Sequence, residues 1–307
     1  MSAAKLGLLA LIALLSAVFF AQWLRLARRR ELRERPTWSD FGIGLLTNFG
    51  DALGIGSYAT TTALYKFRGR PADELIPGTL TVGSVAVGIA ETVIFVTLIR
   101  VDPTLLLAMV ASATVGAWLG AGIVSRMPRR AIQLFMGAAL LIAAAFFIMG
   151  NLGTFPVGGA ALGLSGWRFA AAVAANFILG ALSTIGIGWY APTMVVLALL
   201  GFNLRAAFPI MMGSGGAMLP AAGVRFLRSR RFAWGPSIGF AAAGVVGVLI
   251  AAFIVKSLPL ATLRWLVAAV VTYAAWAMLH SARIEAVAAR RSGPADPLAQ
   301  HLIKGAK

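Results

Sequence analysis

The chain of 307 residues contains no cysteine and only two histidines. Disulfide bonds and cysteine-based metal or thiol chemistry are therefore excluded. His280 ends an apolar run and His301 lies in the C-terminal tail, so the sequence predicts neither a histidine-ligated metal site nor a histidine relay. The G-x-x-x-x-G-K-[ST] motif of nucleotide-binding loops is also missing. No cofactor, metal or catalytic residue is predicted, and the chain is not expected to be an enzyme.

Acidic residues are scarce as well, with 10 Asp and Glu against 27 Lys and Arg, for a net charge of +17. Such an excess can indicate nucleic-acid binding, but here the basic residues gather in short stretches between apolar runs. Membrane proteins show this distribution because their cytoplasmic loops are enriched in Lys and Arg. The sequence has no basic groove with interleaved aromatic residues, so nucleic acid is not predicted as a partner.

Long hydrophobic runs dominate the sequence, of which 60% is hydrophobic. A membrane-spanning helix needs about 20 mostly apolar residues. Runs that approach or exceed this length recur at Leu6–Trp23, Ile76–Ile99, Thr104–Val124, Ala131–Met149, Phe169–Leu200, Ala207–Val224, Ala233–Val255 and Leu260–Leu279. The fold class predicted is an all-α polytopic membrane protein.

The first apolar run could be read as a signal peptide, but its charges lie on the wrong side. The basic stretch RLARRRELRER, Arg25–Arg35, follows the run and does not precede it. This order predicts an uncleaved first helix whose basic end stays in the cytoplasm.

Two polar interruptions of the apolar pattern resemble each other. They are DALGIGSYATTTALYKF at 51–67 and TIGIGWYAPTMVVLALL at 184–200. At an offset of 132 residues, Gly54 and Gly56 align with glycines, Tyr58 with a tyrosine and Thr61 with a threonine. Fixed-period self-similarity indicates an internal duplication. The predicted organisation is an N-terminal helix and basic loop (1–37), a first repeat (38–150), a linker (151–167), a second repeat (168–281) and a cytoplasmic tail (282–307).

The orientation of the repeats depends on the broken segments. If each segment crosses the membrane once, the halves are parallel. If each enters, breaks and returns, every repeat is a re-entrant helix pair with about three spanning helices, and the halves are inverted. The second arrangement places more Lys and Arg in cytoplasmic loops, so the positive-inside rule favours it. Both arrangements remain open from the sequence.

The breaks themselves predict a binding site. Backbone polar groups cannot be left bare in lipid, and paired discontinuous helices in inverted repeats hold the substrate in many transporters. A helix that restarts after a break offers free N–H groups to an anion. We expect Ser57 or Thr60 to cap the first restart and Pro192 to lie in the first turn of the second. The candidate substrate-binding residues are Gly54, Gly56, Ser57, Tyr58, Thr60, Thr61, Gly186, Gly188, Trp189, Tyr190 and Thr193. The alternative is that Gly-x-Gly only permits close helix packing.

Two deep acids, Asp51 and Glu91, are candidates for ion coupling, because ionisable residues inside a membrane segment are functional by default. Asp51 is the candidate for proton coupling; the alternative is that it caps the break or pairs with Asn48. Glu91 is either a second proton site or an ion-pair partner of Arg225 or Arg205.

The stretches TNFGDALGIGSYATTTALYKF at 47–67 and LSTIGIGWYAPT at 182–193 resemble the TauE/SafE sulfite-exporter family, and the resemblance extends over about Trp38–His280. It implies transport of small sulfur-containing anions, such as sulfite or organosulfonates, across the bacterial inner membrane. Ser57 and Trp189 stand where many members have a third consecutive glycine, which predicts a narrower pocket.

The expected function is secondary transport, with export the expected direction and the C-terminus cytoplasmic. The expected partners are a small anionic substrate, with a sulfur oxyanion preferred, and membrane lipid; a homodimer is compatible. A channel-like permease for another small ion is the alternative, and an intramembrane enzyme or a membrane scaffold agrees less well with paired polar breaks.

Overall fold

The computed structural model describes residues 3–28, 34–52, 56–98, 101–186, 188–254 and 260–291. Within these ranges the regular secondary structure is helical, apart from one isolated bridge between Ala161 and Phe202. The helices are α1 (Ala3–Arg28), α2 (Trp38–Ala52), α3 (Ser57–Arg68), η1 (Asp73–Leu75), α4 (Ile76–Leu98), α5 (Pro103–Val124), α6 (Arg129–Asn151), α7 (Gly166–Ser183), α8 (Tyr190–Leu199), α9 (Leu204–Ser229), α10 (Trp234–Ile254) and α11 (Leu260–Arg291). The all-α class is confirmed.

Several of these helices are suited to a membrane. Among the described residues, seven segments are long and apolar enough to cross one, and they lie in α1, α4, α5, α6, α7, α9 and α10. The run Phe169–Leu200 does not form one such segment, because the chain breaks between α7 and α8. The polytopic prediction is thereby confirmed by length and composition.

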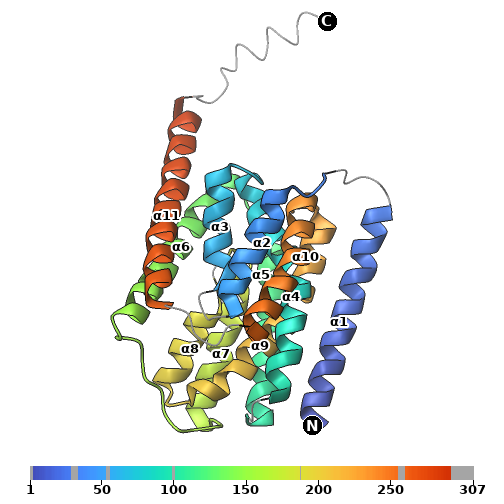
Figure 1. The fold of residues 1–307 in the computed structure, drawn as a ribbon, viewed down its shortest axis with the longest axis vertical. Coiled ribbons are helices and arrows are strands. Elements are labelled where there is room, and N and C mark those ends of the chain that lie inside the picture. Colours follow the sequence, from blue (N-terminus) through green and yellow to red (C-terminus); the bar gives the residue numbers. More distant parts are fainter. Residues whose placement is uncertain are drawn as a thin grey trace, which may run out of the picture.

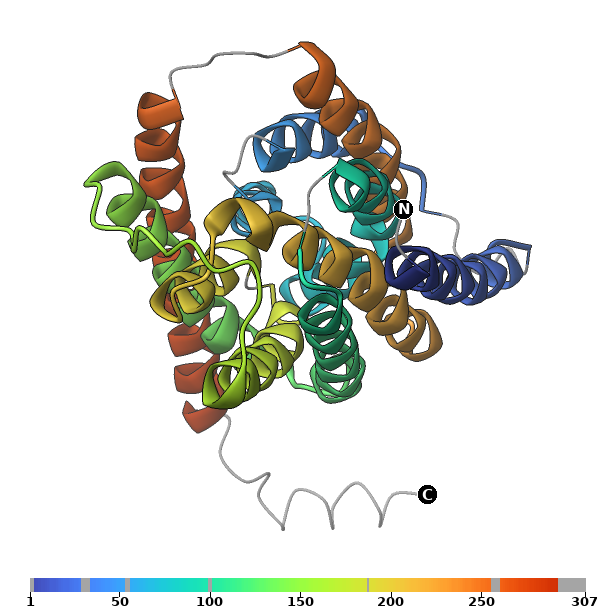
Figure 2. The ribbon, with the colours of Figure 1, turned by 90° about the horizontal axis from the view of Figure 1, so that it is seen from below.

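The N-terminal helix α1 lies at one edge of the bundle, opposite α6 and α11 (Figures 1 and 2). It packs mainly on α9 through buried residues such as Leu8 and Phe19. Near its C-terminal end, the ring of Trp23 stacks on that of Trp234 with centroids 4.7 Å apart. Much of α1 remains exposed, as expected for a helix that faces lipid.

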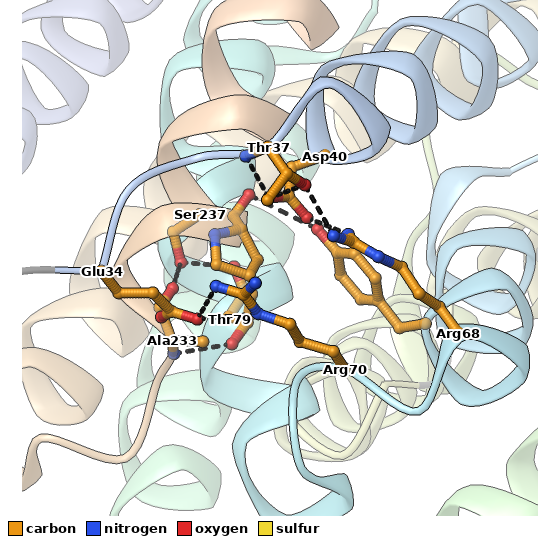
Figure 3. Close-up of polar contacts among 10 residues, drawn as sticks. Glu34, Thr37, Asp40, Arg68, Arg70, Thr79, Ala233 and Ser237 are labelled. Carbon is orange, nitrogen blue, oxygen red and sulfur yellow. Dashed lines mark hydrogen bonds and ion pairs between the residues drawn. The ribbon is translucent and has the colours of Figure 1, made fainter.

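Helices α2 and α3 form an antiparallel hairpin. At one end, Arg68 of α3 bonds to Asp40 and Thr37 at the start of α2, as Figure 3 shows. At the other end, Ser57 of α3 bonds to Asp51 of α2. Because opposite ends of the two helices meet, α3 returns to the side from which α2 entered (Figure 1).

Helices α7 and α8 repeat this arrangement. Thr193 of α8 lies 3.5 Å from the side-chain oxygen of Asn176 in α7. A Cβ placed on Gly201, just after α8, would lie 3.8 Å from the guanidinium of Arg168, near the start of α7. Helix α8 therefore runs antiparallel to α7, and this second hairpin lies on the opposite side of the molecule (Figure 1).

The bundle has two different ends. At the end reached by α3, the Arg231 guanidinium donates to the carbonyl of Met127 at 2.7 Å, and the Ala233 N–H donates to Thr79 Oγ1 at 2.9 Å. We call this end the basic face. The basic side chains whose contacts place them here include Lys66, Arg68, Arg70, Arg129 and Arg231.

The opposite end, which we call the linker face, is covered by residues 152–165. Here the Asn203 N–H donates to the carbonyl of Ala161 at 2.8 Å, and the Asp102 N–H to that of Leu162 at 3.1 Å. The basic residues near the helix ends here include Lys5 of α1, Arg168 of α7 and Arg205 of α9. Which side of the membrane each face meets stays a prediction.

The helices of the two halves correspond in order, from α2–α6 to α7–α11. The contacts correspond too: α2 packs on α10 as α7 packs on α5, while α4 crosses α9 and α6 pairs with α11. Glycines permit the close approaches, because a Cβ on Gly44 would lie 2.6 Å from the Cα of Phe240 and one on Gly120 2.5 Å from the carbonyl of Ala181. Helix α11 continues to Arg291, beyond the predicted end of the second repeat.

Candidate binding site at the two helix breaks

A cavity of about 260 Å³ lies where the two helix breaks meet. Its walls come from the end of α2, the start of α3, the second half of α6, the start of α8 and the first half of α9. The lining residues are Asp51, Ala52, Gly56, Ser57, Tyr58, Ala59, Ile142, Ala143, Phe146, Phe147, Gly150, Phe155, Gly188, Trp189, Tyr190, Ala191, Pro192, Met194, Phe208, Met211 and Met212. Both halves of the chain therefore build one site.

The first break is held by Asp51. Its carboxylate accepts the backbone N–H of Ser57 at 3.0 Å and the Ser57 hydroxyl at 2.7 Å. Gly56 before it has φ 83°, in the left-handed region that favours glycine. The restart of α3 thus receives its cap from across the break.

This arrangement corrects the expected capping. Neither Ser57 nor Thr60 caps α3 with its own side chain. The Thr60 hydroxyl instead donates to the Ser57 carbonyl at 2.9 Å within its helix. The alternative pairing of Asp51 with Asn48 is also not found, since the Asn48 amide donates to the Gly44 carbonyl at 2.8 Å.

The second break has no such carboxylate. Ser183 stands at the position corresponding to Asp51, and its hydroxyl donates to the Gly180 carbonyl at 2.7 Å, inside α7. Gly186 turns the chain with φ 104°. Helix α8 then begins at Tyr190 with Pro192 in its first turn, as expected. The two breaks resemble each other in sequence and differ in charge.

Aromatic rings join the two breaks. Tyr58 and Trp189 meet edge to face with centroids 5.4 Å apart, and Trp189 and Tyr190 do so at 4.7 Å. The indole N–H of Trp189 donates to the Met211 carbonyl at 3.2 Å, which fixes the ring against α9. Such pairs add to the energy of simple burial.

Glu91 lies behind this cluster and does not line the cavity. Its Oε2 accepts the hydroxyl of Tyr190 at 2.7 Å, while its Oε1 is buried without a hydrogen-bond partner among the described residues. The expected ion pair of Glu91 with Arg225 or Arg205 is absent from the described part of the chain. Arg225 instead places its guanidinium 3.6 Å from the ring centroid of Trp118.

Seven of the residues singled out from the sequence line the cavity: Asp51, Gly56, Ser57, Tyr58, Gly188, Trp189 and Tyr190. Thr60, Thr61, Gly186 and Thr193 lie outside its wall; the Thr61 hydroxyl, for example, donates to Thr47 Oγ1 at 2.9 Å. Gly54 lies outside the described residues. The seven lining residues lie next to a break, whereas most of the four residues outside the wall lie about one helical turn away from it.

Sequence reasoning missed the apolar walls, which include Phe146, Phe147, Phe155, Phe208, Met211 and Met212. In a membrane protein, Phe and Met are as common in lipid-facing and packed positions as in a binding site. These residues become cavity walls only because α6, α8 and α9 border the same cavity, so no local signal could have identified them.

Among the described residues of the lining, the ionisable side chains are those of Asp51, Tyr58 and Tyr190, and none is Lys or Arg. The remaining polar side chain is that of Ser57. Within the described residues no group of three or more His, Cys, Asp or Glu could hold a metal ion.

The N-terminal part of the chain is similar to a known family. Residues 2–147 match the family model of the sulfite exporter TauE/SafE. The TauE/SafE resemblance read from the sequence is confirmed over this region, which also includes α1. The second stretch that carried the resemblance, 182–193, lies outside the matched residues. Comparisons with curated proteins and with solved structures gave no match.

Proposed function

We propose that this chain is a secondary transporter that moves small sulfur-containing anions, sulfite or organosulfonates, out across the bacterial inner membrane. The family match indicates a membrane exporter. The observation that carries the proposal is the cavity shared by two broken helices, because transporters place their substrates at such breaks.

The substrate's acidic group would lie at the start of α8. The amides of Tyr190 and Ala191 open this helix, and first-turn amides have no partner within their own helix. The positive end of the helix dipole adds to their attraction for an anion. At α3 the corresponding N–H of Ser57 is already taken by Asp51.

The two halves would act as inverted repeats in alternating access, with the basic face in the cytoplasm as the positive-inside rule requires. The cavity reaches Gly150 and Phe155 toward the linker face, and none of its lining residues comes from the loops of the basic face. This state would exchange substrate with the outside.

A proton carried by Asp51 is the proposed coupling ion, with Glu91 as a second site. The support is that both acids are buried and that Asp51 lines the cavity. Coupling predicts flux that depends on a pH gradient in the wild type and loses this dependence in Asp51→Asn. Gradient-independent flux together with a fully active Asp51→Asn would exclude it.

Binding of small anions to the purified protein is the first test. Sulfite, thiosulfate, sulfoacetate, sulfate and chloride would be compared by thermal shift, in the wild type and in Gly188→Leu. Gly188 does not need a positive φ, and the atom nearest to a Cβ added there would be the Cβ of Tyr58, at 3.9 Å. Leucine should therefore fill the cavity without breaking the backbone.

A sulfur anion that stabilises the wild type but not Gly188→Leu would support the proposal. Flux of that anion into proteoliposomes would then follow, and saturation of the rate would separate a carrier from a channel-like permease. Stabilisation by none of the anions, or equal stabilisation of both proteins, would contradict it.

A further inference from the structure

The side chains described in the cavity offer an acid to the substrate and no cation. Asp51 lines the cavity, and no Lys or Arg among the described lining residues offsets its charge. Behind Tyr190 lies a second acid, Glu91, whose Oε1 is buried without a partner among the described residues. A simple anion would meet the like charge of Asp51, which is unfavourable at short distance.

The neighbours of Asp51 are those of a site for an organic cation. Tyr58 and Trp189 line the cavity beside it, and Tyr190 completes a cluster of three rings. Aromatic faces attract ammonium groups, most strongly when water is excluded. A carboxylate next to such rings can form an ion pair with an ammonium group, while the carbon atoms attached to that group contact the rings.

The opposite pole lies at the start of α8. Its first turn presents amides at Tyr190 and Ala191, and no carboxylate caps it because Ser183 bonds within α7. The cavity therefore has a negative pole at the first break and a positive pole at the second. Phe146, Phe147 and Met211 form apolar wall in the same cavity.

We propose that the substrate is zwitterionic, with an ammonium group held by Asp51 and the aromatic rings and an acidic group held by the amides of α8. This inference rests on the proposed function, since it describes the same site. The apolar walls would contact a short carbon chain that joins the two groups. The ammonium group would offset the charge of Asp51 where a simple anion would need a separate cation.

The test compares probes that differ only in one charged group, 3-aminopropanesulfonate and propanesulfonate, with propylamine as the probe that lacks the acid. Dissociation constants would be measured by calorimetry on the full-length protein in nanodiscs. We expect the aminosulfonate to bind at least about tenfold more tightly than propanesulfonate, because a desolvated ammonium–carboxylate contact is added.

Asp51→Asn should bring the ratio of the two affinities close to one, while Asp102→Asn, the same change at the cap of α5, should leave it as in the wild type. Asparagine can still accept the Ser57 N–H, so the break keeps its cap. Trp189→Leu supplies a second variant, and loss of its ring should reduce the ratio severalfold.

Equal affinities in the wild type, or an unchanged ratio in Asp51→Asn and Trp189→Leu, would overturn the inference. If propanesulfonate and sulfite bind and are transported without any gain from the amine, the proposed function stands and only the zwitterionic substrate fails. If no probe binds and no anion is transported, both proposals fail.

Discussion

Asp51 is the residue that gives the site its character. A carboxylate at a helix restart is a favourable cap, since it accepts an N–H that the helix cannot pair and lies at the positive end of the dipole. Here the same carboxylate also lines the cavity. One side chain therefore combines a structural bond with the one carboxylate that the described lining offers to a substrate.

Removal of this cap should destabilise the protein. In Asp51→Ala, the buried Ser57 N–H and hydroxyl lose their acceptor, and a lost buried partner costs about 1–3 kcal/mol. Asp51→Asn keeps an acceptor and should lose less. Unfolding of both variants in the same detergent measures the difference. An Asp51→Ala variant as stable as the wild type would show that the bond contributes little.

At the scale of helices, a network of polar side chains joins the α2–α3 hairpin to the helices around it. The α2–α3 hairpin is tied at the basic face by side chains. Lys66 donates to Asp73 at 2.7 Å, Gln133 donates to Asp73 at 2.8 Å, and Arg129 lies 3.2 Å from Glu285. This polar network links α3, η1, α6 and α11, and it would have to open if substrate were to leave toward the basic face.

The network should contribute more to stability than the outer ion pair of the same face. Asp73→Ala leaves Lys66 without its carboxylate, and since both side chains are mostly buried we expect a loss of roughly 2 kcal/mol, below the ~3–5 of a fully buried pair. Glu34→Ala breaks the more exposed pair with Arg70 and should cost under about 1 kcal/mol. Unfolding of the two variants under the same conditions tests the order, and a larger loss in Glu34→Ala would contradict it.

On the scale of the whole molecule, the basic face and the linker face are expected on opposite sides of the membrane. The linker face has fewer basic residues than the basic face. The linker is therefore expected outside the cell and the α5–α6 turn inside. The absence of cysteine makes this testable, because an introduced cysteine is the only thiol in the chain.

Val157 in the linker is 91% exposed, and Arg130 at the start of α6 is also exposed. In intact cells, a membrane-impermeant maleimide should label Val157→Cys, and it should label Arg130→Cys only after permeabilisation. The parent chain is the unlabelled control. The reverse pattern would invert the proposed orientation, and labelling of both from one side would contradict a membrane-spanning α6.

The sequence alone determined the class of the protein and the position of its breaks. Apolar runs of spanning length leave few alternatives to membrane helices. Paired Gly-x-Gly stretches marked the two places where helices stop, because glycine reaches the positive φ that Gly56 and Gly186 adopt. The cavity lies at the two breaks, so residues next to a break line it. Seven of the residues singled out from the sequence do so.

Only the tertiary structure decided what surrounds those breaks. The capping of α3 by Asp51 across a loop, the bond of Tyr190 to Glu91 and the apolar wall from α6 all join residues that are distant in the chain or separated by a break. Periodicity reports which face of a helix is apolar, but it does not report which other helix will cover that face. The partners of a buried polar group depend on three-dimensional proximity, and in this protein the packing of α2 on α10, α7 on α5 and α4 on α9 sets that proximity.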